Sequence, residues 1–296
     1  MAKTPLFQGS CTAIVTPYTE RGVDYERLKK NLDYQYESGT AAVVVCGTTG
    51  EAATQSVDEH NELVRFTVQT VGGRMKVVAG VGSNNTQTAL RFAENAKAAG
   101  ADGILMVTPY YNKTSQKGLI EHFTAVADRV EIPMILYNVP SRTGIGIAAE
   151  TYQALARHPN INGIKEASGD FALIYKTRSL CGDELTLWSG NDDNIVPMMA
   201  MGAKGVISVA SNIVPSVVAK LCSLCLEGSF QEAMALFARY NALFGALFIE
   251  TNPIPVKAAM KLLGTDSGFL RLPLTEIGDE HLQKLKTVMQ DVGLKV

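Results

Sequence analysis

The chain has 296 residues, 46% of them hydrophobic and 19% charged, which is the profile of a globular protein with a substantial core. Its formal net charge of -2 argues against broad electrostatic attraction to nucleic acid or anionic membranes, so anions should be bound locally. We expect a cytoplasmic location, because residues 1–5 lack the apolar run of a signal peptide and no later segment approaches a membrane span.

The cysteines and histidines do not indicate a metal site. The 5 cysteines are odd in number and scattered, which favours a reducing compartment over a disulfide framework. Cys222 and Cys225 match C-x-x-C, but they lie in an apolar, helix-like run without a second pair. The 4 histidines are far apart in the sequence. We therefore predict no metal and no cofactor.

Apolar strand-length segments alternate with amphipathic helix-length segments along most of the chain. The predicted strands are residues 11–16, 41–46, 76–80, 103–107, 134–137, 163–165, 185–188 and 205–208. The predicted helices between them include residues 24–38, 56–71, 86–99, 116–130, 148–157, 171–179 and 192–201. Ser56 followed by Glu59 has the spacing of a capping box at the start of its helix.

This alternation predicts an α/β fold, a (β/α)8 TIM barrel with a C-terminal helical extension. The alternative is an open doubly wound sheet, but residues 80–85 lack the third glycine of a dinucleotide-binding motif. After about residue 212 only helical patterns follow, at 229–248, 255–263 and 279–292. We expect residues 1–225 to form the catalytic barrel and residues 226–296 a helical region packed on it.

In such a barrel, functional residues belong at the carboxyl ends of the strands, and Lys165 ends the predicted strand 163–165. A lysine there is expected to lose its proton more easily through burial or a neighbouring cation, and its amine could then attack a carbonyl. The alternative is a lysine whose stem packs while its head reaches water or pairs with Glu166. This stretch by itself leaves both interpretations open.

Other strand ends carry polar residues that could act with such a lysine. Residues 47–51 (Gly-Thr-Thr-Gly-Glu) could turn backbone N–H groups toward a carboxylate, or could simply form a βα turn. Tyr137 could relay a proton if a hydroxyl such as Thr49 accepts its hydrogen bond, or could be a packed rim residue. Arg142 could hold a substrate carboxylate or lie solvated in its loop. Tyr110 and Tyr111 suit an exposed aromatic contact.

Taken together, a strand-end lysine, a tyrosine, an arginine and a hydroxyl-rich loop indicate carbon–carbon bond chemistry on a keto acid. A protonated imine withdraws electrons from the adjacent carbon, so a nucleophilic enamine can form without a metal.

Three motifs carry a resemblance to a known family: residues 47–51, residues 137–143 (Tyr-Asn-Val-Pro-Ser-Arg-Thr) and residues 163–170 (Gly-Ile-Lys-Glu-Ala-Ser-Gly-Asp). They resemble the dihydrodipicolinate synthase family of pyruvate-dependent, lysine-Schiff-base aldolases, and the likeness covers essentially the whole chain. Arg142 points to the synthases rather than to N-acetylneuraminate lyases or 2-keto-3-deoxy sugar acid aldolases. The resemblance implies a lyase that condenses pyruvate with L-aspartate-4-semialdehyde to 4-hydroxy-tetrahydrodipicolinate, the entry to diaminopimelate and lysine biosynthesis.

The resemblance also implies roles for single residues. Lys165 would form the imine, and Tyr137, Thr49 and Tyr111 would form a proton relay, with Tyr111 contributed across a dimer interface. The implied substrate-binding residues are Thr48 and Thr49 for the pyruvate carboxylate, Arg142 for the carboxylate of the aldehyde, and Gly190 and Ile207 through backbone groups. A homotetramer built from two tight dimers would be the assembly.

In relatives inhibited by lysine, an effector site near the dimer interface uses positions that match Ala52, Val57, His60, Asn84, Thr88 and Tyr110. His60, Asn84 and Tyr110 are compatible with such a site. Val57 replaces a histidine and Thr88 an acidic residue, so a partner for the effector's ammonium groups is lost. We therefore predict weak or absent inhibition by lysine.

A different class of function is also possible: a barrel that binds a keto acid as a sensor without turning it over.

Overall fold

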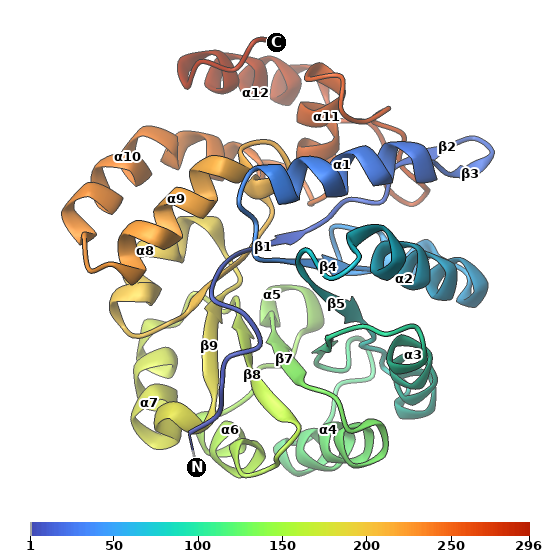
Figure 1. Ribbon diagram of the computed structural model, residues 1–296, viewed down its shortest axis with the longest axis vertical. Helices are drawn as coiled ribbons and strands as arrows, with labels where there is room; N and C mark the ends of the chain where they lie inside the picture. Colours follow the sequence, from blue (N-terminus) through green and yellow to red (C-terminus); the bar gives the residue numbers. More distant parts are fainter. Residues whose placement is uncertain (1) are drawn as a thin grey trace.

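The computed structural model describes residues 2–296, and eight of its strands close into a parallel barrel (Figure 1). Around the barrel the order is β1-β10-β9-β8-β7-β6-β5-β4. Their bounds are β1 Gly9–Ala13, β4 Ala42–Val45, β5 Lys76–Gly80, β6 Gly103–Val107, β7 Met134–Asn138, β8 Ile161–Glu166, β9 Thr186–Ser189 and β10 Gly205–Ser208. A separate hairpin pairs β2 (Tyr18–Thr19) with β3 (Gly22–Val23). The predicted (β/α)8 barrel is confirmed, and the open doubly wound sheet is excluded.

Helices follow the barrel strands as the sequence pattern predicts. Their bounds are α1 Tyr25–Glu37, α2 Val57–Val71, α3 Thr86–Ala98, α4 Gln116–Val130, α5 Pro140–Thr143, α6 Ala149–Ala156, α7 Phe171–Cys181, α8 Ile195–Ala200 and α9 Pro215–Leu226. The capping box at Ser56 and Glu59 is present, with each side chain bonded to the other residue's backbone N–H. The predicted helix 192–201 is instead a short 3-10 turn followed by α8. Pro197 has no N–H to extend helical bonding back to residue 193, which accounts for the break.

The C-terminal region consists of α10 (Phe230–Ala246), α11 (Ile254–Leu262) and α12 (Asp279–Asp291). Figure 1 shows α11 and α12 beyond α1 and the β2–β3 hairpin, at the opposite end of the molecule from the N-terminus. Because α9 follows β10 and packs on β1, it is the eighth helix of the barrel. We propose the domain boundary at 225/226 on this ground, since it lies one residue before the end of α9 at Leu226.

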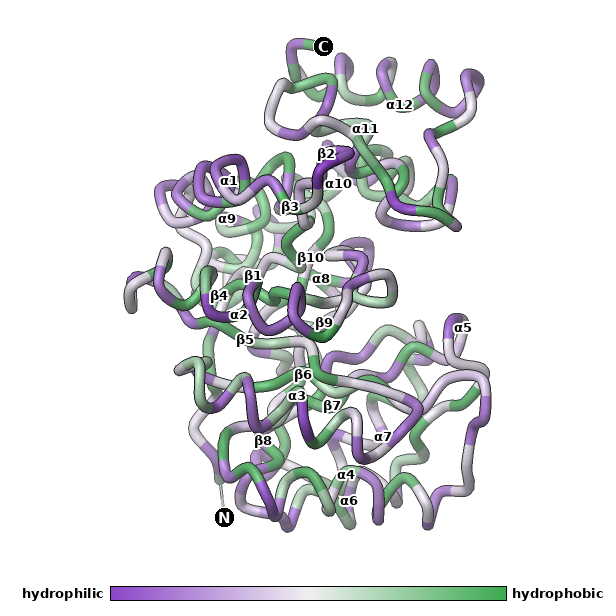
Figure 2. Tube along the Cα trace, turned by 90° about the vertical axis from the view of Figure 1, so that its right-hand side faces the viewer, coloured by the Kyte–Doolittle hydropathy of each residue, from purple (hydrophilic) through white to green (hydrophobic). Residues whose placement is uncertain are grey.

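Apolar side chains form two cores. One lies between the barrel and its surrounding helices, and the other lies inside the barrel. In the inner core Phe7 stacks on Trp188, with ring centroids 4.7 Å apart. Figure 2 shows hydrophilic and hydrophobic residues alternating along α12, as expected for a helix with one buried face. Across residues 2–296, no helix has both the length and the apolar character needed to span a membrane.

Candidate active site

Lys165 and Tyr137 lie side by side at the carboxyl ends of two neighbouring strands. Their Cα atoms are register partners between β8 and β7, so both side chains project to the same side of the sheet. The Lys165 Nζ lies 4.3 Å from the centroid of the Tyr137 ring. Lys165 is 5% exposed and Tyr137 is 7% exposed. The strand register therefore places an amine and a phenol side by side, both largely buried by their neighbours.

The alternative in which Lys165 pairs with Glu166 is wrong, because consecutive strand residues face opposite sides of the sheet. The Glu166 carboxylate accepts hydrogen bonds from Asn138 Nδ2 at 3.1 and 3.0 Å and from Tyr152 Oη at 2.9 Å. The backbone N–H of Ser168 adds a fourth hydrogen bond at 2.8 Å. Glu166 thus ties β8 to β7 and α6 on the outer side of the barrel, and Lys165 faces inward.

The loop of residues 46–51, called here the threonine loop, carries Thr48 and Thr49 between two non-glycine residues with left-handed backbone. Cys46 and Glu51 both have φ 56°. The loop also needs the glycine at position 80, because a Cβ there would lie 2.2 Å from the Cys46 carbonyl oxygen. Backbone N–H groups of Gly50, Glu51 and Ala52 bond back to carbonyls of the loop.

Thr48 and Thr49 differ in their surroundings. Thr49 is 3% exposed, and its Oγ1 accepts a hydrogen bond from Asn252 Nδ2 at 3.0 Å. Thr48 is exposed and lines the same cavity. Within the described chain, neither backbone N–H has a protein acceptor and no direct hydrogen bond joins Thr49 to Tyr137. The loop therefore presents free N–H donors, the arrangement that binds a carboxylate.

A cavity of about 740 Å³ brings most of the predicted site residues together. Those that line it are Thr48, Thr49, Tyr137, Arg142, Lys165 and Gly190. Of the predicted catalytic and substrate-binding residues, two lie elsewhere: Ile207 is fully buried in the inner core, and Tyr111 is 92% exposed on the surface. The polar strand ends of the sequence therefore converge on one cavity.

Arg142 reaches this cavity from α5, the short helix after β7. Its Nη2 donates to the Asn252 carbonyl at 3.3 Å. A guanidinium group has five N–H donors in a planar fork, so this single bond orients Arg142 and leaves donors for a carboxylate.

Gly190 is in the cavity wall because the ends of β8 and β9 approach closely there. Its N–H donates to the Glu166 carbonyl at 2.8 Å. A Cβ at this position would lie 2.7 Å from the Ala167 Cβ, so a larger residue would push the two strand ends apart. Glycine at position 190 therefore allows the ends of β8 and β9 to pack closely at the cavity wall.

Sequence reasoning missed the contribution of the C-terminal region to the cavity. Residues 248–252, between α10 and α11, line it together with the barrel residues. Asn252 is 4% exposed and contacts both Thr49 and Arg142. In the sequence, Asn252 precedes Pro253 and lies between the predicted helices 229–248 and 255–263, which gives no indication of a contact with the barrel. A polar residue beside a proline, between two predicted helices, is the one signal that could have identified it.

The predicted effector positions lie around α2 and the starts of α3 and α4. His60 is buried, its Nε2 lies 2.7 Å from the Gly80 carbonyl oxygen, and its ring stacks on Phe92 at 4.1 Å. Burial lowers the pKa of His60. Tyr110 is 39% exposed, and the carbonyl of Asn84 accepts a hydrogen bond from a neighbouring side chain. The effector role of these residues remains a prediction.

Among the described residues, no cluster of three or more His, Cys, Asp or Glu side chains is arranged to hold a metal ion. The five cysteines are free and buried. Burial raises the pKa of Cys222 and of Cys225.

The closed (β/α)8 barrel places a lysine, a tyrosine and an arginine around one polar cavity at its strand ends, where barrel enzymes have their active sites. Residues 6–292 match the sequence profile of the Dihydrodipicolinate synthetase family. The chain belongs to this family, as its three motifs predicted.

Individual relatives agree with this assignment over nearly the full length. The 4-hydroxy-tetrahydrodipicolinate synthase of Thermoanaerobacter sp. (strain X514) is 48% identical over 291 residues, covering 98% of both chains. The dihydrodipicolinate synthase of Aquifex aeolicus superposes with a TM-score of 0.95 at 44% identity, covering 98% of this chain and 100% of that one. The chloride-inhibited dihydrodipicolinate synthase of Acinetobacter baumannii, solved in complex with pyruvate, gives a TM-score of 0.95 at 39% identity, with 97% and 99% covered.

Proposed function

We propose that this chain is a lyase with 4-hydroxy-tetrahydrodipicolinate synthase activity, in the pathway to lysine, and that it condenses pyruvate with L-aspartate-4-semialdehyde. The observation that carries the proposal is the buried Lys165 beside Tyr137 in the cavity at the strand ends. The activity agrees with the names of relatives that match 98% of the chain, and the pyruvate complex of one relative supports the first substrate.

The first chemical step forms an imine. The Lys165 amine attacks the ketone carbon of pyruvate, and the carbonyl oxygen takes one proton from the amine and a second from the proton relay. It then leaves as water, and a protonated imine remains. The free N–H groups of Thr48 and Thr49 hold the pyruvate carboxylate, which fixes the ketone next to the amine. Gly190 and Ile207 contribute backbone groups to this part of the site, with Ile207 acting from the inner core.

The second step makes and uses a carbon nucleophile. Loss of a proton from the methyl carbon of the imine gives an enamine, whose carbon attacks the aldehyde of the second substrate. The amino group of that substrate then attacks the imine carbon, closes the ring and releases Lys165. Tyr137, Thr49 and a second subunit's copy of Tyr111 relay the protons. Asn252 donates to the Thr49 oxygen, which leaves the Thr49 hydroxyl proton free to donate.

Arg142 holds the carboxylate of the aldehyde substrate. Its fork of donors lies on the cavity wall, and its bond to the Asn252 carbonyl keeps it aimed there. Because a bidentate arginine–carboxylate pair depends on planar geometry, a lysine at position 142 would be a poor replacement.

We further propose a homotetramer of two tight dimers in the cytoplasm. Tyr111 is 92% exposed and has φ 70°, an unusual backbone for an aromatic residue without a packing role in its own chain. Replacing Tyr111 with Ala should lower kcat, and the unfolding midpoint of the protein should change little because the side chain is almost fully exposed in its own chain.

Activity assays and thermal unfolding measure these two quantities, and sedimentation velocity reports the assembly. A fully active monomer would contradict the shared relay.

This chain has Val57 where relatives inhibited by lysine have a histidine, and Thr88 where they have an acidic residue. The loss of these polar partners supports weak or absent inhibition by L-lysine. A titration of activity with L-lysine tests this, and half-inhibition at submillimolar concentration would contradict it.

The decisive experiment for the activity is borohydride reduction of the protein with pyruvate, followed by peptide mass spectrometry. We expect a stable adduct on Lys165 that needs pyruvate. An adduct on another residue, or none, would overturn the mechanism. Assays with aspartate semialdehyde against N-acetylmannosamine then separate the synthase from a sugar acid aldolase, and trapping without turnover would identify a sensor.

A further inference from the structure

The threonine loop has a backbone conformation that needs support from outside the loop. Left-handed φ values at Cys46 and Glu51 flank Thr48 and Thr49. Residues with a Cβ atom disfavour this region, and such conformations persist where surrounding contacts determine them. Contacts from outside the loop must therefore hold it in place.

The C-terminal region supplies the contacts at Glu51. Lys257 Nζ lies 2.7 Å from Glu51 Oε1, and both side chains are 0% exposed. The backbone N–H of Arg271 donates to Glu51 Oε2 at 3.1 Å. Lys257 Nζ also donates to the Thr16 carbonyl at 3.0 Å. Both oxygens of the Glu51 carboxylate are therefore bound by residues more than 200 positions along the chain.

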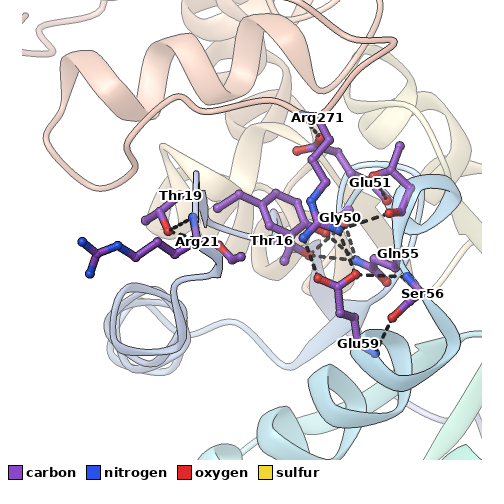
Figure 3. A network of polar contacts seen from close by, with 12 residues as sticks. Thr16, Thr19, Arg21, Gly50, Glu51, Gln55, Ser56, Glu59 and Arg271 are labelled. Atoms are coloured by element: carbon purple, nitrogen blue, oxygen red, sulfur yellow. Dashed lines mark hydrogen bonds and ion pairs between the residues drawn. The ribbon is translucent and has the colours of Figure 1, made fainter.

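Neighbouring contacts hold the rest of the loop. Gln55 Nε2 and Thr16 Oγ1 each donate to the Gly50 carbonyl at 2.8 Å. The Arg271 guanidinium pairs with both carboxylate oxygens of Glu59, at 2.9 and 2.5 Å. Figure 3 shows Arg271 reaching from the C-terminal region into this network around Gly50 and Glu51.

The pair of Glu51 and Lys257 does not line the cavity, so neither side chain can touch the substrate. A buried ion pair contributes little net stability compared with a well-packed apolar pair, but it demands one geometry. The residue immediately before Glu51 is Gly50, and the two before that are the threonines of the site. A shift of about 1 Å in such groups can cost two orders of magnitude in rate.

We propose that Glu51 and Lys257 are positioning residues that hold Thr48 and Thr49 in the geometry that binds the two-oxo acid. The C-terminal region then determines affinity for pyruvate without contacting it. This inference rests on the proposed function, because it assigns pyruvate binding to the threonine loop.

The test compares KM for pyruvate with kcat in variants that do not strand a buried charge. Glu51→Gln/Lys257→Met removes both charges together, and Glu51→Asp keeps the pair but shortens its reach by one methylene. We expect KM for pyruvate to rise about 10- to 100-fold in the double variant and several-fold in Glu51→Asp, because the loop loses its geometry. Because Thr49 also belongs to the proposed proton relay, we expect kcat to fall as well, by about 10-fold, whereas KM for the aldehyde should stay within about threefold. Lys261→Met/Glu276→Gln, an exposed pair that includes α11, is the matched control and should leave all constants unchanged.

Each outcome decides one proposal. If the parent protein is trapped by borohydride at Lys165 and the variants keep the parent KM for pyruvate, the positioning role is overturned, whatever happens to their unfolding midpoints. Glu51→Asp keeps the test valid if the double variant does not fold. If the parent protein itself is not trapped with pyruvate, the proposed function fails instead. Raised KM for pyruvate with Lys165 still trapped at saturating pyruvate supports the positioning role.

Discussion

The two sides of the cavity are built in different ways. One side, the strand wall, consists of Lys165 and Tyr137 on adjacent strands, aligned as register partners. The other side, the threonine loop, is held by Asn252, Lys257 and Arg271 from the C-terminal region. The strand wall depends on hydrogen bonds that the barrel needs in any case. The threonine loop depends on a small number of contacts over long sequence distances.

The strand wall gets its geometry from barrel closure, and the threonine loop gets its geometry from long-range contacts. A one-residue slip of β8 would turn Lys165 out of the barrel and Glu166 into it, so barrel closure itself specifies the strand wall. Strand pairing does not fix the position of Thr49, because the threonine loop, with left-handed backbone at both ends, is not hydrogen-bonded into the sheet. Substitutions on the strand wall should therefore affect chemistry most. Substitutions behind the threonine loop should affect pyruvate binding and stability, and also the proton relay through Thr49.

The largest effect is expected for Lys165→Met. The methionine keeps an apolar stem of similar length but has no amine, so kcat/KM should fall by at least about 10³-fold. Steady-state kinetics and pyruvate trapping measure the loss. The unfolding midpoint should stay near that of the parent. A variant as active as the parent would show that the Lys165 amine takes no part in the reaction.

Breaking the buried pair behind the threonine loop should have the largest effect on stability. Lys257→Met leaves the Glu51 carboxylate uncompensated in the core, which costs about 3–5 kcal/mol of unfolding free energy. Removing both charges in Glu51→Gln/Lys257→Met should restore much of that loss. Urea unfolding checks both variants, and equal losses in the single and the double variant would show that packing, not charge, is at stake.

A smaller effect is expected behind the strand wall, at Glu166. In Glu166→Gln the new amide places an N–H group among the donors of Asn138 and Ser168, so one donor loses its acceptor. Unfolding free energy should fall by about 1–3 kcal/mol. Glu150→Gln, which alters an exposed pair with Lys176 on the surface, is the control and should change little. Urea unfolding of both variants makes the comparison, and equal losses would contradict it.

The smallest effect concerns pH. The hydrogen bond from Arg271 is the main cause that lowers the pKa of Glu59 from 4.5 to about 2. A carboxyl group with a lowered pKa in the folded state contributes stability that is present above its unfolded pKa of about 4.5 and is lost as the pH falls through about 2. Because Glu59 is at the surface, the contribution is modest.

Glu59→Gln should therefore lower the unfolding temperature relative to the parent most strongly above about pH 5, and the difference should shrink toward pH 2. Thermal unfolding from pH 6 to pH 2 provides the measurement. A difference that stays constant over this range would show that the ion pair with Arg271 does not account for it.

The amino-acid sequence determined the parts of this protein that depend on local pattern. The bounds of β5, β6 and β10 and of α4 agree with the periodicity of their residues, and Ser56 and Glu59 form the capping box that their spacing predicts. Strand ends in a parallel barrel gather at one rim, so Lys165, Tyr137 and Arg142 could be assigned to one site before any coordinates were known. The family motifs added the chemistry.

Long-range contacts, which local sequence pattern does not encode, account for the rest of the site. Whether Lys165 faces the cavity or pairs with Glu166 depended on the register between β7 and β8. The attachment of Asn252 to Thr49, 203 residues apart, and of Lys257 to Glu51, 206 apart, has no local signature. Propensity and periodicity act over one or two turns of chain, whereas a buried charge finds its partner only when folding brings distant segments together.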